Sequence, residues 1–246
     1  MKDLNEFEHK GWIKFEFDHR VARWAKAANS KITLKLKNKQ ILKNNLTCQG
    51  TWFVGVDALD NDSDGALGKI SLSGPFKSLM KSFETGGLHS AQVSIIFEGY
   101  PKPRDQESES SFNFRLKRDA AHVDGLIADF PGGPRKLKEP HAFVLGIPIN
   151  QAPKGASPIV VWEGSHHLIS QALKRLFLNR DPGEWKDLDV REVYLQTRKT
   201  VFEKCKRRSW SRGAVERCIT IFRTKVGHNW NRYWLFSRNC QWRIQG

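Results

Sequence analysis

Cysteine is scarce in this sequence, and its cysteines are not grouped. The four of them, Cys48, Cys205, Cys218 and Cys240, form no Cys-x-x-Cys pair, so neither a zinc knuckle nor a disulfide framework is predicted. No apolar run approaches the roughly eighteen residues that a membrane-spanning helix needs. The first nine residues carry acids where a secretion signal needs a basic and then an apolar stretch. We therefore expect a cytoplasmic protein with reduced thiols that does not bind a membrane.

Charge is abundant but unevenly distributed. The formal net charge is +6 for residues 1–45, −2 for 46–170 and +11 for 171–246. The two basic ends mix arginine, lysine and tryptophan, and such a blend can bind nucleic acid through phosphate contacts and base stacking. A basic surface is more often a solvated face. Nucleic-acid binding through the basic C-terminal segment is therefore kept as an alternative.

Hydrophobic periodicity predicts a mixture of strands and helices. Strands are predicted where apolar residues alternate or form short runs: 51–56, 91–97, 112–117, 141–149, 158–162, 218–226 and 233–237. Helices are predicted at 17–28, 75–83, 165–179 and 189–205, with Ser165 as the cap of the third. The polar stretch 101–111 is predicted to be a loop, either a plain connector or a lid. The acidic stretch 57–65 departs from calcium-loop spacing and is predicted to be a polar loop.

The most informative feature lies in the stretch 118–125. There His122 and Asp124 place an imidazole and a carboxylate two positions apart. One histidine and one carboxylate make two-thirds of a facial metal triad, which a distant histidine completes. Taken alone, such a pair is more often part of an ordinary loop, so its surroundings must decide.

Those surroundings resemble a known family. The order is a predicted strand, His-x-Asp, a predicted apolar strand, the turn Gly146-Ile-Pro-Ile-Asn150, a third predicted strand and Trp162-Glu-Gly-Ser-His166. This order resembles the Fe(II)/2-oxoglutarate-dependent oxygenases, and most of all their phytanoyl-CoA dioxygenase-like branch. In that branch Pro-Gly-Ser-His commonly occurs where this chain has Glu163-Gly-Ser-His. The resemblance covers roughly residues 90–170 well and the last fifty poorly.

The resemblance implies a mainly β fold with flanking helices, namely a double-stranded β-helix of the jelly-roll or cupin-like kind. One domain would span 1–246. Residues 1–89 would form helices and strands packed on the barrel, and 90–246 would form the barrel with a helical insertion at about 165–205. It also implies ferrous iron, 2-oxoglutarate as co-substrate, O2, and a dioxygenase that hydroxylates a small-molecule substrate.

By the same resemblance, a distal histidine is expected 60 to 110 residues after His-x-Asp, with an arginine about ten residues further on. Only His228 falls in that window, and Arg238 follows it. The implied roles are His122, Asp124 and His228 as metal ligands and Arg238 as the group that binds the far carboxylate of 2-oxoglutarate. A guanidinium fork suits that carboxylate. His166 and His167 are expected to cap or pack rather than to bind metal.

The C-terminus departs from the family pattern. The segment Arg212-Gly-Ala-Val215 resembles the turn before the distal histidine, but the histidines expected next to it do not follow. Tryptophan, cysteine and arginine crowd the last forty residues, a composition typical of translation in a shifted reading frame. A second hypothesis is therefore the same fold with an incomplete metal site and no catalysis.

Overall fold

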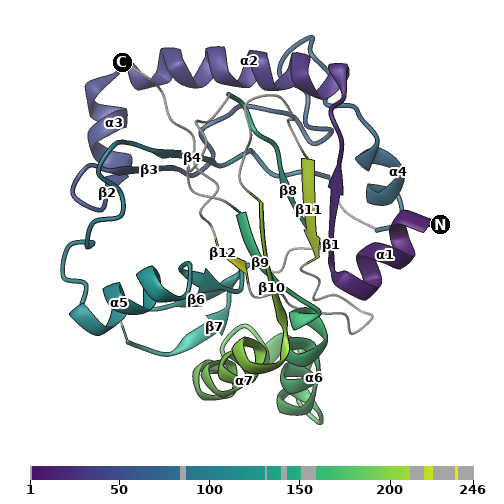
Figure 1. Cartoon of the computed structure of the whole chain (residues 1–246), viewed down its shortest axis with the longest axis vertical. Helices are drawn as coiled ribbons and strands as arrows, with labels where there is room; N and C mark the ends of the chain where they lie inside the picture. Colours follow the sequence, from purple (N-terminus) through teal and green to yellow (C-terminus); the bar gives the residue numbers. More distant parts are fainter. Residues whose placement is uncertain are drawn as a thin grey trace.

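The computed structural model describes residues 2–83, 87–130, 132–139, 143–150, 159–210, 219–223 and 236–237. Its helices are α1 (Lys2–Lys10), α2 (His19–Leu36), α3 (Lys39–Asn45), α4 (Phe76–Met80), α5 (Glu109–Lys117), α6 (Ser165–Phe177) and α7 (Arg191–Lys204), with a 3-10 turn at Pro182–Glu184. Its strands are β1 (Trp12–Phe15), β2 (Leu46–Thr47), β3 (Trp52–Gly55), β4 (Val93–Ile96), β5 (Ala121–His122), β6 (Leu126–Ala128), β7 (Arg135–Leu137), β8 (Phe143–Gly146), β9 (Ile159–Glu163), β10 (Lys206–Trp210), β11 (Ile219–Arg223) and β12 (Phe236–Ser237). Figure 1 shows the long α2 on one side of the molecule and α6 and α7 on the opposite side.

Helix α2 begins where the sequence supplies a cap. The Asp18 carboxylate accepts hydrogen bonds from the backbone N–H groups of Arg20 and Val21, which satisfies donors that a helix start leaves without partners. Its buried residues recur every three or four positions: Val21, Trp24, Ala25, Ala28 and Ile32. The helix runs to Leu36, eight residues past the predicted end, because this apolar stripe continues through Ile32.

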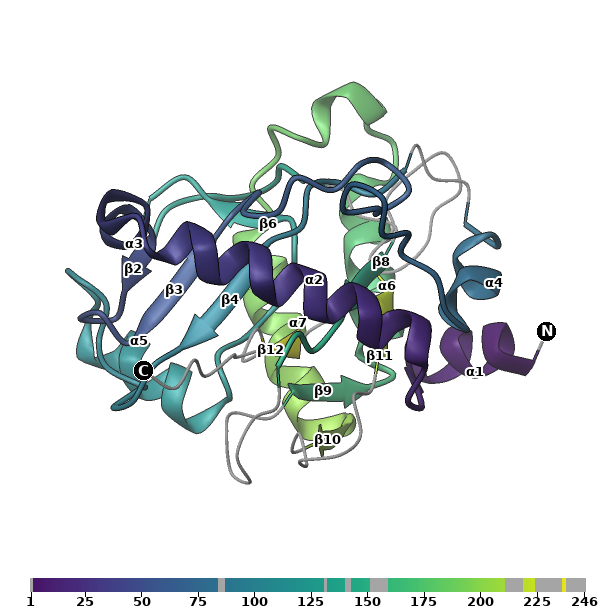
Figure 2. The same cartoon turned by 90° about the horizontal axis from the view of Figure 1, so that it is seen from above.

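The first hydrophobic core lies under α2. Trp24, Ala25 and Ala28 pack there with Phe53 of β3 and Ile95 of β4. Strands β2, β3 and β4 form a three-stranded antiparallel sheet. Seen from above in Figure 2, α2 runs diagonally across these strands. The predicted strands at 51–56 and 91–97 and the predicted helix at 75–83 are confirmed, each in a shorter form.

Strands β6 and β7 pair with each other, and the other remaining strands pair in a nested pattern. Strand β9 pairs with β10, β8 pairs with β11, and β5 pairs with β12, all antiparallel. Additional pairs join β1 to β11 and β12 to β9. The result is a three-stranded sheet in the order β1-β11-β8 and a four-stranded sheet in the order β10-β9-β12-β5. Segments far apart in the sequence are thus brought to adjacent strands.

Alternation along β9 shows how these two sheets are layered. Val160 and Trp162 pack into the core formed with α6 and α7. Ile159 and Val161, on the other face, pack against Trp12 of β1 and Val144 of β8. The opposite face of the first sheet packs into the core under α2, through β1 and β8 side chains such as Ile13, Phe15, Phe143 and Leu145. The order of layers is therefore α2, sheet β1-β11-β8, sheet β10-β9-β12-β5, and then α6 with α7.

Two local predictions were wrong. Residues 112–117, predicted to be a strand, form most of α5. The Ser108 side chain caps this helix by accepting from the Ser111 N–H, and the helix buries Arg115 rather than a row of alternating phenylalanines. Ser165, predicted to cap α6, is the first residue of that helix. The cap position belongs to Gly164 in a left-handed conformation, without a side-chain hydrogen bond.

Candidate metal site

Strand β5 ends at His122, and Asp124 lies two residues further on, in the turn that follows the strand. Ala121 and Val123 are buried in the core shared with α6 and α7. Because successive side chains of a strand point to opposite faces, His122 lies on the face directed toward the sheet β1-β11-β8. The register agrees with this, since Phe236 pairs with both His122 and Val161. The structure brings the Asp124 carboxylate next to this histidine.

The two side chains approach each other closely. His122 Nε2 lies 3.5 Å from Asp124 Oδ1, with the imidazole 27% exposed and the carboxylate 5% exposed. Two cis ligand atoms, each about 2.1 Å from an ion, lie about 3 Å apart. The observed separation is near that value and longer than a good hydrogen bond between the two atoms. The pair therefore fits one edge of a divalent-metal coordination shell.

The other ring nitrogen of His122 is already engaged. Nδ1 lies 2.9 Å from the carbonyl oxygen of Ala120. A carbonyl only accepts hydrogen bonds, so Nδ1 is the donor in this contact. Metal-bound histidines in proteins are held in the same way, with the second nitrogen donating to a carbonyl or carboxylate.

The turn that follows Asp124 is fixed by a glycine. Gly125 has φ of +77°, and a β-carbon there would collide with the carbonyl oxygen of Glu139. The Gly125 carbonyl accepts hydrogen bonds from the N–H groups of Lys138 and Glu139. Only glycine permits both this φ and this close approach. The His122–Asp124 pair is thereby joined to the antiparallel hairpin of β6 and β7.

The turn that precedes β5 is unusual. Asp119 and Ala120 both have φ of +52°, a region that residues with a β-carbon rarely occupy. The N–H groups of Ala120 and Ala121 close the turn by donating to the carbonyls of Arg115 and Arg118. The Asp119 carboxylate receives both Nε and Nη2 of Arg207, each at 2.8 Å. This hydrogen bonding to Asp119 raises the pKa of the Arg207 guanidinium.

The two remaining predicted site residues, His228 and Arg238, lie outside the described residues. Strand β12, which lies between them in sequence, pairs directly with β5. Within the described part of the chain, no group of three or more histidine, cysteine, aspartate or glutamate residues could hold a metal ion. The described chain therefore supplies two of the four predicted groups and brings those two together.

His166 and His167 lie elsewhere and serve another purpose. Their Nε2 atoms lie 2.8 Å and 3.3 Å from the carbonyl oxygens of Glu8 and His9, at the end of α1. Their rings lie 3.8 Å apart. Helix ends leave carbonyls without intrahelical donors, and these imidazoles satisfy them. The packing role predicted for this pair agrees with the contacts.

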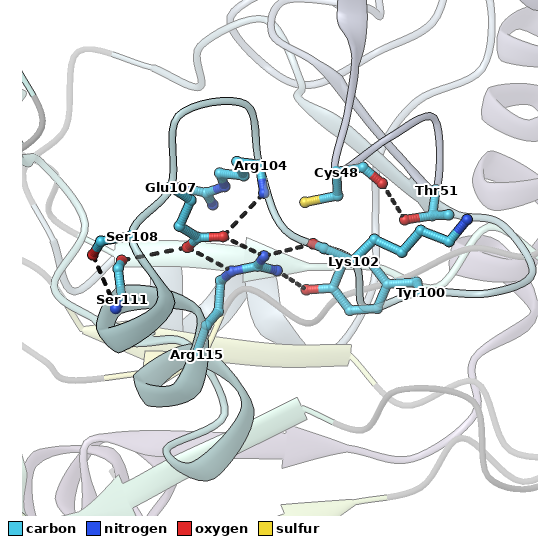
Figure 3. Close-up of polar contacts among 9 residues, drawn as sticks. All are labelled: Cys48, Thr51, Tyr100, Lys102, Arg104, Glu107, Ser108, Ser111 and Arg115. Atoms are coloured by element: carbon cyan, nitrogen blue, oxygen red, sulfur yellow. Dashed lines mark hydrogen bonds and ion pairs between the residues drawn. The ribbon is translucent and has the colours of Figure 1, made fainter.

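Sequence reasoning missed a buried ion pair next to the site. Arg115 of α5 donates to both carboxylate oxygens of Glu107, at 3.1 Å and 2.7 Å, and to the carbonyl of Lys102. Figure 3 shows the guanidinium pointing from α5 into the loop that carries Glu107 and toward Tyr100. The two charged side chains are only 6% and 7% exposed. The sequence offered no signal beyond an arginine and a glutamate eight positions apart.

The hydrogen bonds between Glu107 and Arg115 keep both side chains charged despite their burial. Burial alone raises the pKa of Glu107, but hydrogen bonds from Arg115 and the Arg104 backbone leave it below its ordinary value. Burial alone lowers the pKa of Arg115, and Glu107 reverses that shift so that the pKa is raised. Both groups are therefore charged at neutral pH. This pair anchors the end of α5, four residues before Asp119.

The acidic stretch 57–65 forms a loop held by its own carboxylates. Asp62 accepts from the backbone N–H groups of Asp64 and Ala66. Asp60 forms ion pairs with Lys31 and Lys35 of α2. The carboxylates thus bind backbone groups and lysines rather than converging on one point. The predicted polar loop agrees with these contacts.

Comparisons with protein-family models, with curated proteins and with solved structures find no match to this chain. Among the described residues there is no helix with the length and apolar character required to cross a membrane. Any proposal about function must therefore rest on the residues themselves and on their placement.

Proposed function

We propose that this chain is built as an Fe(II)/2-oxoglutarate-dependent dioxygenase that hydroxylates a small molecule, with His122 and Asp124 as two of its metal ligands. The observation that carries the proposal is the geometry of this pair. Nε2 and Oδ1 lie 3.5 Å apart, and His122 Nδ1 lies 2.9 Å from the Ala120 carbonyl oxygen. An imidazole and a carboxylate presented side by side suit ferrous iron in a facial site.

The nested strand pairing supports the fold that this function requires. In a jelly roll, an antiparallel ribbon folds over so that its strands are shared between two facing sheets. The same nesting is found here, where β9 pairs with β10, β8 with β11 and β5 with β12. The two sheets lie face to face, in contact through Ile159, Val161, Trp12 and Val144. His122 lies on the face between them.

Each residue would have a defined task. His122 would present Nε2 and Asp124 an oxygen to Fe(II), while Gly125 and the β6–β7 hairpin keep their separation fixed. His228 would supply the third ligand, and Arg238 would bind the far carboxylate of 2-oxoglutarate. When bound, the iron and the keto acid supply the oxidising chemistry for a C–H bond. The protein's contribution is to place that bond and exclude water.

The alternative is a chain that keeps the pair but lacks the third ligand. His228 falls in the stretch 224–235, between β11 and β12, and Arg238 directly follows β12. Because β12 pairs with β5, this C-terminal segment is the part of the chain that would have to complete the site. If the segment is translated in a shifted frame, the ion would have two protein ligands. Such a site would bind metal weakly and would not catalyse hydroxylation.

Anaerobic titration with Fe(II) and 2-oxoglutarate tests the proposal. We expect the weak visible absorption band of the iron–keto acid chelate, and we expect His122→Ala and Asp124→Ala to abolish it. His89→Ala, which removes an exposed imidazole outside the site, should leave the band intact. A band that survives in His122→Ala would overturn the assignment of this residue.

His228→Ala distinguishes the complete from the incomplete site. In a complete site the band is lost and succinate formation stops. In an incomplete site the wild-type chain already binds iron weakly, and this substitution changes neither the affinity nor the succinate yield. Translating the coding DNA in its other two frames beyond Cys205 provides an independent check. A histidine followed about ten residues later by arginine, the spacing that the family resemblance implies, would identify the lost segment.

A further inference from the structure

The arginines around α5, α7 and β10 fall into two groups. Three of them donate to carboxylates of the chain: Arg115, Arg207 and Arg208. The other two, Arg118 and Arg198, form no ion pair or side-chain hydrogen bond within the part of the chain that the structure describes. Arg118 is exposed, whereas Arg198 is half-buried, and a charge withdrawn from water is ordinarily paired. Arg198 thus has N–H donors left for an acceptor that the described chain does not supply.

Both unpaired guanidinium groups rest on aromatic rings. The guanidinium carbon of Arg198 lies 4.1 Å from the ring centroid of Phe114 and 5.2 Å from that of Tyr194. The guanidinium carbon of Arg118 lies 4.8 Å from the ring centroid of Phe202. The Phe114 and Phe202 rings are themselves 6.1 Å apart. The two arginine–aromatic pairs are therefore neighbours at the contact between α5 and α7, and each ring attracts the cation above it.

Helical spacing explains how the sequence assembles this group. Tyr194, Arg198 and Phe202 follow one another at intervals of four along α7. Phe114 and Arg118 have the same interval at the end of α5. Residues four apart lie on one face of a helix. Each helix therefore contributes one face on which arginines and aromatic rings alternate.

The carboxylates of the two helices lie on other faces. Glu192 and Glu203 are turned by about 120° and 140° around α7 from Arg198, and Glu109 is turned by about 140° around α5 from Phe114. The buried hydroxyl of Tyr194 does not accept from Arg198 either, since it has no hydrogen-bond partner in the described chain. Among the described residues, no acceptor competes for the two guanidinium groups.

The surroundings favour a polymer of phosphates over a single small anion. Residues 171–246 carry a net charge of +11, and Lys199, Lys204 and Lys206 are exposed at the end of α7 and the start of β10. A positive field spread over several residues attracts a chain of negative charges. Arg118 has one face against Phe202, and a flat guanidinium face can stack on a nucleobase. Bases within a duplex are already stacked on each other, so a single strand is the better fit.

We propose that Arg118 and Arg198 bind single-stranded nucleic acid at the contact between α5 and α7, with Arg198 donating to phosphate oxygens and Arg118 stacked on a base. This surface lies across the sheet from His122. Phe202 packs against Trp162, which enters the core shared with α6 and α7, whereas His122 lies on the opposite face. The inference therefore does not depend on the proposed oxygenase function.

Fluorescence anisotropy of the full-length protein with a labelled oligo(dT) of about 16 nucleotides tests the proposal, at a series of salt concentrations. Arg118→Ala should weaken binding about tenfold, as expected for the loss of one stacked base. Arg198→Ala should reduce the slope of log affinity against log salt by about 0.7, the value for one phosphate contact on a single strand. Arg175→Ala removes the same charge from an exposed position on α6 and should bind as the wild type does. If all three variants behave alike, the proposal is wrong.

A purely structural role for the two arginines gives a different result. In that case the substitutions would lower the melting temperature but leave the salt slope and affinity of the folded protein unchanged, and the proposal would be overturned. Arg118→Gln and Arg198→Gln keep a planar polar end on the side chain and serve if circular dichroism shows that the alanine variants do not fold. Folded glutamine variants with wild-type affinity and salt slope would also overturn it.

Three further probes define the ligand. A duplex of the same length should bind more weakly than the single strand, because its bases cannot stack on Arg118. Inorganic phosphate should displace the oligonucleotide no better than chloride does at the same ionic strength. Equal affinity for the duplex, or specific displacement by phosphate, would overturn the assignment to a single strand. Tighter binding to phosphatidylserine vesicles that Arg198→Ala abolishes would point to a membrane surface and would overturn it as well.

Discussion

The core under α2 and the α5–β5 junction are stabilised by different kinds of interaction. The core under α2 is built from fully buried apolar side chains such as Ala25, Phe53 and Ile95. The junction is built from the Arg115–Glu107 and Arg207–Asp119 pairs and a left-handed turn. Apolar burial is non-directional, whereas bidentate ion pairs fix angles as well as distances. Directional contacts are thus found in the junction that leads into His122 and Asp124, whereas apolar burial stabilises the core under α2.

Of the two regions, the apolar core is expected to lose the most stability when one side chain is removed. Phe53 is 0% exposed, and removing a fully buried phenylalanine side chain costs about 3–5 kcal/mol through lost burial and the cavity left behind. Phe53→Ala should therefore lower the free energy of unfolding, measured by urea denaturation, by that amount. Phe130→Ala, the same substitution at a position 61% exposed, should change it little. A loss at Phe53 below about 1 kcal/mol would show that this core can collapse around the cavity.

That core was also the part most readily predicted from the sequence. The three-or-four-residue spacing of Val21, Trp24, Ala25 and Ala28 indicates one buried helix face, and the structure buries all four. Alternation in 91–97 likewise predicted β4. The buried face of a helix or strand follows from the spacing of apolar residues within that one element, so the local sequence is enough to predict it.

The junction could not be predicted in the same way. Phe112, Phe114 and Leu116 alternate as in a strand, yet the segment is helical because Ser108 caps it and Arg115 turns inward to Glu107. The partner of Asp119 lies 88 residues away in β10. A long-range ion pair leaves no periodic trace, so spacing singled out His122 and Asp124 as candidates but gave no sign of the Asp119–Arg207 pair.

The next largest effect is expected at the buried ion pair of the junction. Glu107→Gln leaves the Arg115 guanidinium buried without its counter-charge, and breaking such a pair costs about 3 kcal/mol. Glu109→Gln, at an exposed position two residues away, is the matched control and should be close to neutral. The double variant Glu107→Leu/Arg115→Met should recover most of the loss, because no unpaired charge remains. Equal stability of Glu107→Gln and wild type would mean that the pair contributes no net stability.

The same pair should make stability depend on acid. The pKa of Glu107 in the folded chain lies below its ordinary value of 4.5. The stabilisation that ionised Glu107 gives the folded chain is therefore complete above pH 4.5, and it is lost as the pH falls through the lower pKa of the folded state. Between about pH 6 and pH 3, the wild type should lose more unfolding free energy than Glu107→Gln does. If urea denaturation shows the same loss of unfolding free energy in both proteins, Glu107 does not cause the acid dependence.

The smallest expected effect has the opposite sign and tests the strain in the junction. Ala120 at φ of +52° carries a left-handed penalty of about 1–2 kcal/mol, and glycine there would avoid it while adding about 0.5–1 kcal/mol of chain entropy cost. Ala120→Gly should therefore stabilise the protein by about 0.5–1 kcal/mol. Ala22→Gly, within α2, should instead destabilise by a similar amount, because its backbone is helical and gains nothing from glycine. Thermal unfolding of the two variants gives the comparison directly. If Ala120→Gly is destabilising, the turn is not strained, and its shape is an intrinsic preference of this segment rather than one enforced by Arg207.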